Sequence, residues 1–114
     1  MIYIASPYSH KDPAIMQQRF EAVEKLTAKL MRDGLPVFSP IVHTHALAQK
    51  YSLPTDFAFW QSHCLTLLSR ADYMIVYTLP GWEKSTGING EIDFCKQQGI
   101  TVHYHEHKPD PEAA

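Results

Sequence analysis

A chain of 114 residues, 45% of them hydrophobic and 19% charged, has the size and composition of one soluble globular domain. Its formal net charge of -2 offers no basic excess that would hold a phosphate backbone, so duplex nucleic acid is excluded as an expected partner. No apolar run approaches the roughly 20 residues that a membrane-spanning helix needs.

The N-terminus and the cysteines indicate the compartment. Residues 1–5, Met-Ile-Tyr-Ile-Ala, enter a strand-like run at once and carry no basic segment of the kind that opens a signal peptide. Cys64 and Cys95 fall in separate predicted helices, where they are expected as small, reduced core residues rather than as a disulfide. We therefore expect a cytoplasmic protein.

Apolar periodicity and turn residues predict four strands separated by helices. Asp12-Pro13 gives the first helix an N-cap followed by proline in its first position, and Gly34 ends that helix. The clearest strand is the apolar run at 72–79, and the weakest element is a short helix within 42–54. In chain order the predicted elements are a strand at 1–5, a helix at 13–33, a strand at 35–39, a helix near 44–50, a helix at 56–70, a strand at 72–79, a helix at 87–97 and a strand at 100–104.

Strands that alternate with helices need crossover connections, which predicts a parallel sheet of four or five strands between two layers of helices. The strand order 2-1-3-4 would make this a small, doubly wound α/β sheet. One domain is expected over residues 1–107, and the composition of residues 108–114 is typical of a flexible C-terminal tail. In such sheets ligands bind beyond the carboxyl ends of the strands, at the switch point. The predicted site therefore lies among the loops that follow the first three strands.

The loop after the third strand carries the strongest chemical signal. Gly81, Gly87 and Gly90 allow a ligand to approach the backbone, and the last two are expected to leave room for a sugar. Ser85 can either cap the helix that follows or bind a phosphate at its positive end. Glu91 lies about one turn into that helix. It is either a catalytic carboxylate or only a complement to the helix dipole, and both alternatives remain at this point.

Hydroxyls and aromatic rings supply further binding candidates. Tyr3, Ser6 and Tyr8 place hydroxyls at or near the end of the first strand, although a strand tyrosine also fits a core position and a serine also forms turns. Trp60 and Trp82 can sandwich a base or a sugar between their rings. Trp60 fits the core equally well, whereas the position of Trp82 in the glycine-rich loop favours contact with a ligand or a partner.

The seven histidines suggest a metal site as a further hypothesis. His43 and His45, and likewise His103, His105 and His107, would share one face of a strand if those segments are extended. No cysteine or carboxylate cluster completes a typical zinc set, so a chance surface cluster is the preferred interpretation and no metal is expected. The glycine-rich loop lacks the lysine spacing of a Walker motif, and we expect no cofactor.

Four motifs are spaced along the chain: Tyr3 followed by Ala5-Ser6-Pro7-Tyr8, then Phe59-Trp60, then Arg70-Ala71-Asp72 before a strand, and Leu79-Pro80-Gly81-Trp82-Glu83-x-Ser85-x-Gly87-x-x-x-Glu91. Together they resemble the nucleoside 2-deoxyribosyltransferase-like superfamily. The last motif is closest to a small branch of it that is classified as a domain of unknown function. The resemblance covers about residues 1–105.

This resemblance implies a flavodoxin-like, three-layer fold, a homodimer or higher oligomer, and a nucleoside or nucleotide as the small-molecule partner. It implies that Glu91 is the nucleophile, that Ser85 contacts the phosphate or sugar, and that Tyr3 orients Glu91.

The chain departs from the superfamily at one position. The aspartate that contacts the base in the superfamily falls on Cys64 in this sequence. Asp56, His63 or a residue of another subunit are the candidates to replace it, unless the substrate needs no such acid.

The expected activity is cleavage or transfer of an N-glycosidic bond. Breaking the C1′–N bond builds positive charge on the sugar, which a carboxylate beneath C1′ stabilises and captures covalently. Release to water gives a hydrolase, and release to a second base gives a transferase. The alternative of another class is a non-catalytic nucleotide-binding module, which needs Ser85 and the glycine-rich loop but not Glu91.

Overall fold

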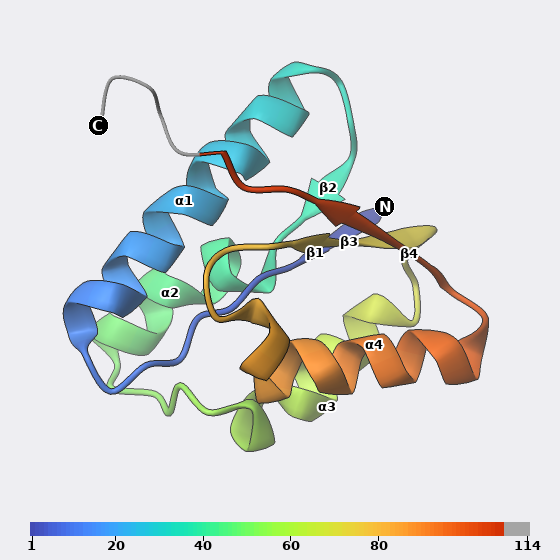
Figure 1. Ribbon diagram of the computed structural model, residues 1–114. Helices are drawn as coiled ribbons and strands as arrows, with labels where there is room; N and C mark the ends of the chain where they lie inside the picture. The colour runs from blue at the N-terminus through green and yellow to red at the C-terminus, as the bar shows by residue number, and fades with distance from the viewer. Residues whose placement is uncertain (109–114) are drawn as a thin grey trace.

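The computed structural model describes residues 1–108 and contains a four-stranded, all-parallel sheet. The strands lie in the order β2-β1-β3-β4, which confirms the predicted doubly wound α/β topology. Their bounds are β1 Ile2–Ala5, β2 Val37–Phe38, β3 Tyr73–Tyr77 and β4 Thr101–His105. Figure 1 shows the sheet between two layers of helices, as in a flavodoxin-like, three-layer arrangement.

The helices are α1 Pro13–Arg32, α2 Pro40–Lys50, α3 Phe57–Leu68 and α4 Thr86–Gln98, with a single 3₁₀ turn, η1, at Trp82–Lys84. The predicted cap of α1 is confirmed, because the Asp12 carboxylate accepts a hydrogen bond of 2.9 Å from the Ala14 amide. Gly99 ends α4 with φ 71°, a left-handed conformation that glycine adopts without strain.

Helix α2 is longer than the sequence analysis predicted. It begins at Pro40 rather than near residue 44, because Ser39 caps it by accepting a hydrogen bond of 3.2 Å from the Val42 amide. Ser39-Pro40 is thus a helix start of the same kind as Asp12-Pro13, with proline in the first turn where no amide proton is needed. The loop predicted after β3 likewise contains the short turn η1.

The core has two halves, one on each face of the sheet. Alternate residues of β1 point to opposite faces, so Ile2 and Ile4 pack on the α1 side while Tyr3 and Ala5 pack on the side of α3 and α4. Because Tyr3 is buried on the side of α3 and α4, its hydroxyl lies beneath the helix that carries Glu91.

Two sequence predictions concern the ends of the chain and the membrane. The predicted tail, 108–114, lies outside the described residues apart from Lys108. None of the helices within residues 1–108 combines the length and apolar character that crossing a bilayer requires.

Candidate active site

A cavity of about 590 Å³ lies where the loops after β1, β2 and β3 meet. Ser6 and Tyr8 line it from the first loop, Pro40 from the start of α2, and Ser85 and Glu91 from the start of α4 and its second turn. The cavity thus occupies the region in which a doubly wound sheet binds its ligands.

Tyr3 and Glu91 form a buried pair beside this cavity. The Tyr3 hydroxyl, on β1, donates a hydrogen bond to Oε2 of Glu91, on α4. Tyr3 is fully buried and Glu91 is 5% exposed, yet the Glu91 side chain belongs to the cavity wall. The structure therefore brings together the two residues that the resemblance singled out as catalytic.

Burial, and not the helix dipole, controls the protonation of Glu91. Glu91 is the sixth residue of α4 and lies in its second turn, where the favourable effect of the helix end has largely faded. A carboxylate that only complements the helix dipole, the alternative role considered for Glu91, would lie in the first turn, and Glu91 does not. Burial raises the pKa of Glu91 to about 7, and the hydrogen bond from Tyr3 lowers it by a smaller amount.

The two groups beside Glu91 keep their protons at neutral pH. Burial, reinforced by the nearby Glu91 charge, raises the pKa of the Tyr3 hydroxyl far above its ordinary range. Burial likewise raises the pKa of the Cys64 thiol to about 11. Tyr3 therefore keeps the proton that it donates to Glu91, and Cys64, a residue of the cavity wall, is a neutral thiol where the superfamily has an aspartate.

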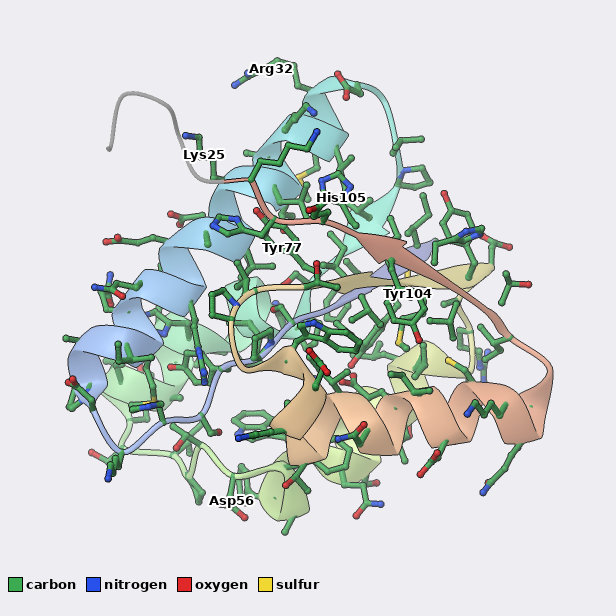
Figure 2. The ribbon with its side chains drawn as sticks, viewed as in Figure 1. Lys25, Arg32, Asp56, Tyr77, Tyr104 and His105 are labelled. Atoms are coloured by element: carbon green, nitrogen blue, oxygen red, sulfur yellow. The ribbon has the colours of Figure 1, made fainter. Side chains whose placement is uncertain are left out.

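The candidates to replace that aspartate are placed differently. Asp56, just before α3, lines the cavity, and Figure 2 shows it at the beginning of that helix. His63 is not part of the cavity wall and stacks against His43 with ring centroids 6.4 Å apart. Of the two, only Asp56 can reach a ligand directly.

Hydroxyls at the cavity differ in how they are used. Ser85 caps α4, since its oxygen accepts a hydrogen bond of 3.2 Å from the Ile88 amide. Ser6 Oγ is buried at the cavity wall and has no hydrogen-bond partner within the described residues. A buried hydroxyl without a partner is costly, so Ser6 presents an open hydrogen-bonding position to a ligand.

The glycines of α4 make room for Phe57 rather than for a ligand. A Cβ at Gly90 would lie 2.8 Å from Cε2 of Phe57, and a Cβ at Gly87 would lie 3.2 Å from Cδ1 of the same ring. The expectation that these glycines leave space for a sugar is thus wrong. Gly87 still lines the cavity beside the Phe57 ring.

The two tryptophans do not face each other across the cavity. Trp60 lines it and is held by a hydrogen bond of 2.7 Å from its indole nitrogen to the Pro54 carbonyl. Trp82, in η1, is outside the cavity wall and packs on Tyr104 with ring centroids 5.6 Å apart. The predicted sandwich of a base between Trp60 and Trp82 is therefore not formed.

Residues 1–107 match the model of a family described as a domain of unknown function, DUF1937. The chain belongs to the DUF1937 family. No protein of curated function matches its sequence.

The sequence analysis did not identify Arg19, which also lines the cavity. Its guanidinium, on α1, donates hydrogen bonds to the carbonyls of Ser9 at 3.0 Å and Pro80 at 3.3 Å, which joins the loops after β1 and β3. It also lies against Gly81, where an added Cβ would be 2.7 Å from Nη2. No spacing in the sequence signals this contact, because it depends on how α1 packs.

The histidines of this DUF1937 chain are divided among separate contacts. His43 and His45 lie on helix α2, so the condition under which they would share one face of a strand is not met. His103 packs against Tyr73 and His105 against Tyr77, while His107 shares a hydrogen bond of 2.8 Å with the Tyr77 hydroxyl. Within residues 1–108, no three His, Cys, Asp or Glu side chains come together as a metal site.

Proposed function

We propose that this DUF1937 protein cleaves the N-glycosidic bond of a nucleoside or nucleoside 5′-monophosphate, with Glu91 as the nucleophile. The single observation that carries the proposal is the buried Tyr3–Glu91 pair at the wall of the cavity. The resemblance to the nucleoside 2-deoxyribosyltransferase-like superfamily supports the same assignment.

The chemistry follows from the charge that develops during cleavage. As the C1′–N bond lengthens, positive charge grows on the sugar, and an ionised Glu91 placed beneath C1′ stabilises it. The carboxylate oxygen then bonds to C1′ while the bonding electrons leave with the base. The hydroxyl of Tyr3 holds one carboxylate oxygen, so the other is the one that attacks.

Binding groups surround this carboxylate on several sides. Trp60 and Phe57 offer apolar surfaces for a base or a sugar ring, and Ser6 offers an unpaired hydroxyl. Thr86 and Gly87, the first two residues of α4, line the cavity, and the free amides at the positive end of a helix favour a phosphate.

The departing base meets no strong acid at Cys64. A neutral thiol with a pKa of about 11 is a poor proton donor, so the substrate class that fits best has a base that leaves readily or is protonated by Asp56.

A non-catalytic nucleotide-binding module is the second candidate function. It is favoured by the pKa of about 7 that burial gives Glu91, because much of this carboxyl is then protonated at neutral pH in the empty site. A binding module would use the cavity and the start of α4 without any bond to C1′.

A screen of nucleosides and their 5′-monophosphates for release of free base tests the proposal, with Glu91→Gln as the matched variant. The glutamine keeps an acceptor for Tyr3 but cannot attack C1′. We expect base release by the unmodified protein, loss of at least 100-fold in Glu91→Gln, and similar ligand affinity in both by calorimetry. Binding without base release in either protein would establish the binding module instead.

A further inference from the structure

A chain of hydrogen bonds runs from the cavity through α2 to α1. The hydroxyl of Tyr8, a residue of the cavity wall, lies 2.6 Å from Nδ1 of His45. Nε2 of His45 lies 3.2 Å from Oε1 of Gln17, and Nε2 of Gln17 donates to a carboxylate oxygen of Glu21 at 3.1 Å. Of these four residues, Tyr8 lines the cavity and His45, Gln17 and Glu21 do not.

The Glu21 carboxylate determines the direction of every bond in this chain. The Gln17 amide nitrogen donates to a carboxylate oxygen of Glu21, so the amide oxygen of Gln17 is the atom that faces His45. Nε2 of His45 must then carry the proton, which leaves Nδ1 of the neutral ring as an acceptor. The hydroxyl of Tyr8 therefore donates to His45, and the Tyr8 oxygen keeps its lone pairs for a group in the cavity.

The surroundings of His45 keep it neutral and in place. The ring is 5% exposed, and burial lowers the pKa of His45, against a smaller opposing effect of Glu24. Burial also raises the pKa of Tyr8, so both members of the pair hold the protonation states that the bond directions require. Phe20 stacks on the imidazole with ring centroids 3.8 Å apart and an interplanar angle of 12°.

We propose that Tyr8 activates the water that releases the sugar from Glu91, with His45 as the proton acceptor behind it, so that the reaction is a hydrolysis. This inference rests on the proposed function. The water oxygen bonds to C1′ as the bond from C1′ to the Glu91 oxygen breaks, and that electron pair returns to the carboxylate. One water proton passes to the Tyr8 oxygen while the Tyr8 hydroxyl proton passes to Nδ1 of His45.

The same bond directions argue against a role for Tyr8 in the first half of the reaction. Protonating the departing base would require Tyr8 to turn its proton away from His45 and leave Nδ1 unpaired. Accepting a proton requires no such change. The imidazolium that results stacks on the Phe20 ring and donates from Nε2 to the Gln17 oxygen, and these two contacts offset part of the cost that burial imposes on its charge.

Tyr8→Phe tests the assignment, because it keeps the ring and removes only the hydroxyl. The probes are 7-methylguanosine, 7-methyl-2′-deoxyguanosine and their 5′-monophosphates, whose cationic base leaves without protonation. Rapid-quench kinetics on Tyr8→Phe should show a burst of about one equivalent of base per site. Steady turnover should then be at least 100-fold below that of the unmodified protein.

Two further measurements separate catalysis from a structural effect. Azide needs no base to attack C1′, so it should restore turnover of Tyr8→Phe and form a glycosyl azide. Gln17 is an exposed residue of α1, and Gln17→Met removes the oxygen that accepts the hydrogen bond from Nε2 of His45. We expect this variant to lose less steady turnover than Tyr8→Phe, with the same burst and the same rescue by azide.

Tyr77→Phe is the matched control. It removes another tyrosine hydroxyl that is bonded to a histidine, at 2.8 Å from Nδ1 of His107, and Tyr77 does not line the cavity. Figure 2 shows Tyr77 near His105 and far from Asp56 at the start of α3. Turnover of this variant should equal that of the unmodified protein.

The outcomes separate the relay from the proposed function. Unchanged turnover in Tyr8→Phe, or a burst that is lost together with turnover and not rescued by azide, would overturn the role of Tyr8 while leaving Glu91 as nucleophile. If the unmodified protein releases no more base from any probe than Glu91→Gln does, both proposals are overturned.

Discussion

The ionisation of Glu91 depends on a balance between burial and one hydrogen bond. The carboxyl is 5% exposed, which raises its pKa from an ordinary 4.5 to about 7, and the Tyr3 hydroxyl offsets part of that rise. Between these two values the folded chain holds a proton that the unfolded chain has lost. The free energy of unfolding must therefore fall as the pH rises from about 4.5 to about 7.

Glu91→Gln should remove this pH dependence. A difference between 4.5 and about 7 corresponds to an upper limit of about 3 kcal/mol, so the variant should gain roughly 1–3 kcal/mol relative to the unmodified protein when the pH rises from 4.5 to 8. Urea denaturation at both pH values measures the gain. Parallel stability curves for the two proteins would show that Glu91 ionises as it does in the unfolded chain.

Tyr3→Phe should move the pH dependence of catalysis. Because the hydrogen bond from Tyr3 lowers the pKa of Glu91, its loss should raise that pKa further above 7. The rising limb of kcat/KM, which reports ionisation of the free enzyme, should then shift to higher pH. A loss of activity that is the same at every pH would assign Tyr3 a packing role only.

At the scale of the elements, α3 and α4 pack closely at the cavity because the ring of Phe57 lies against two glycines of α4. Phe57, the first residue of α3, fills the space beside Gly87 and Gly90 in the first turns of α4. The contact fixes how closely the two helices approach, and with it the position of Glu91 one residue beyond Gly90.

A double-mutant cycle between Gly90 and Phe57 tests this fit. Replacing a glycine within a helix by alanine ordinarily stabilises it by about 1 kcal/mol. Here the new Cβ would lie 2.8 Å from Cε2 of Phe57, so Gly90→Ala alone should destabilise the protein. In a Phe57→Ala background the same change should raise Tm. Equal effects in both backgrounds would contradict the close contact.

The sequence predicts the elements well where local signals suffice. The strand order, the cap at Asp12 and Gly34 just after the end of α1 all follow from periodicity and turn chemistry. Ser39-Pro40 is an equally clear signal for the start of α2, but a proline after a strand also fits the end of that strand, so the helix is predicted to begin too late.

Contacts made by tertiary packing could not be predicted in the same way. The role of His45 depends on its helix turning it toward Tyr8 and Gln17, whereas an extended segment would have placed it beside His43. The contacts of Arg19 with two loops, and the packing of Trp82 on Tyr104, likewise arise only from the assembled fold.

At the scale of the whole molecule, apolar residues remain on the surface of the single chain. Tyr51 is 62% exposed, and within residues 1–108 the other large exposed apolar side chains are Met31, Leu35, Leu47, Phe59 and Tyr104. Scattered exposure of this kind occurs in monomers, but in a chain this small it also suits a symmetric interface.

We propose that the protein forms a homodimer or a larger oligomer that covers part of this surface. Light scattering at micromolar concentration should give at least twice the 13.0 kDa mass of one chain. Tyr51→Ser should reduce that mass if this exposed ring lies in the interface. A mass of one chain throughout the concentration range would contradict the proposal.

The most direct test of Glu91 as nucleophile is the mass of the protein quenched in acid during turnover of a substrate from the base-release screen. The account predicts an adduct of one glycosyl group, mapped by peptide fragmentation to Glu91, which is absent in Glu91→Gln and accumulates in Tyr8→Phe. Base release at an unchanged rate by Glu91→Gln, or an adduct on any other residue, would contradict it.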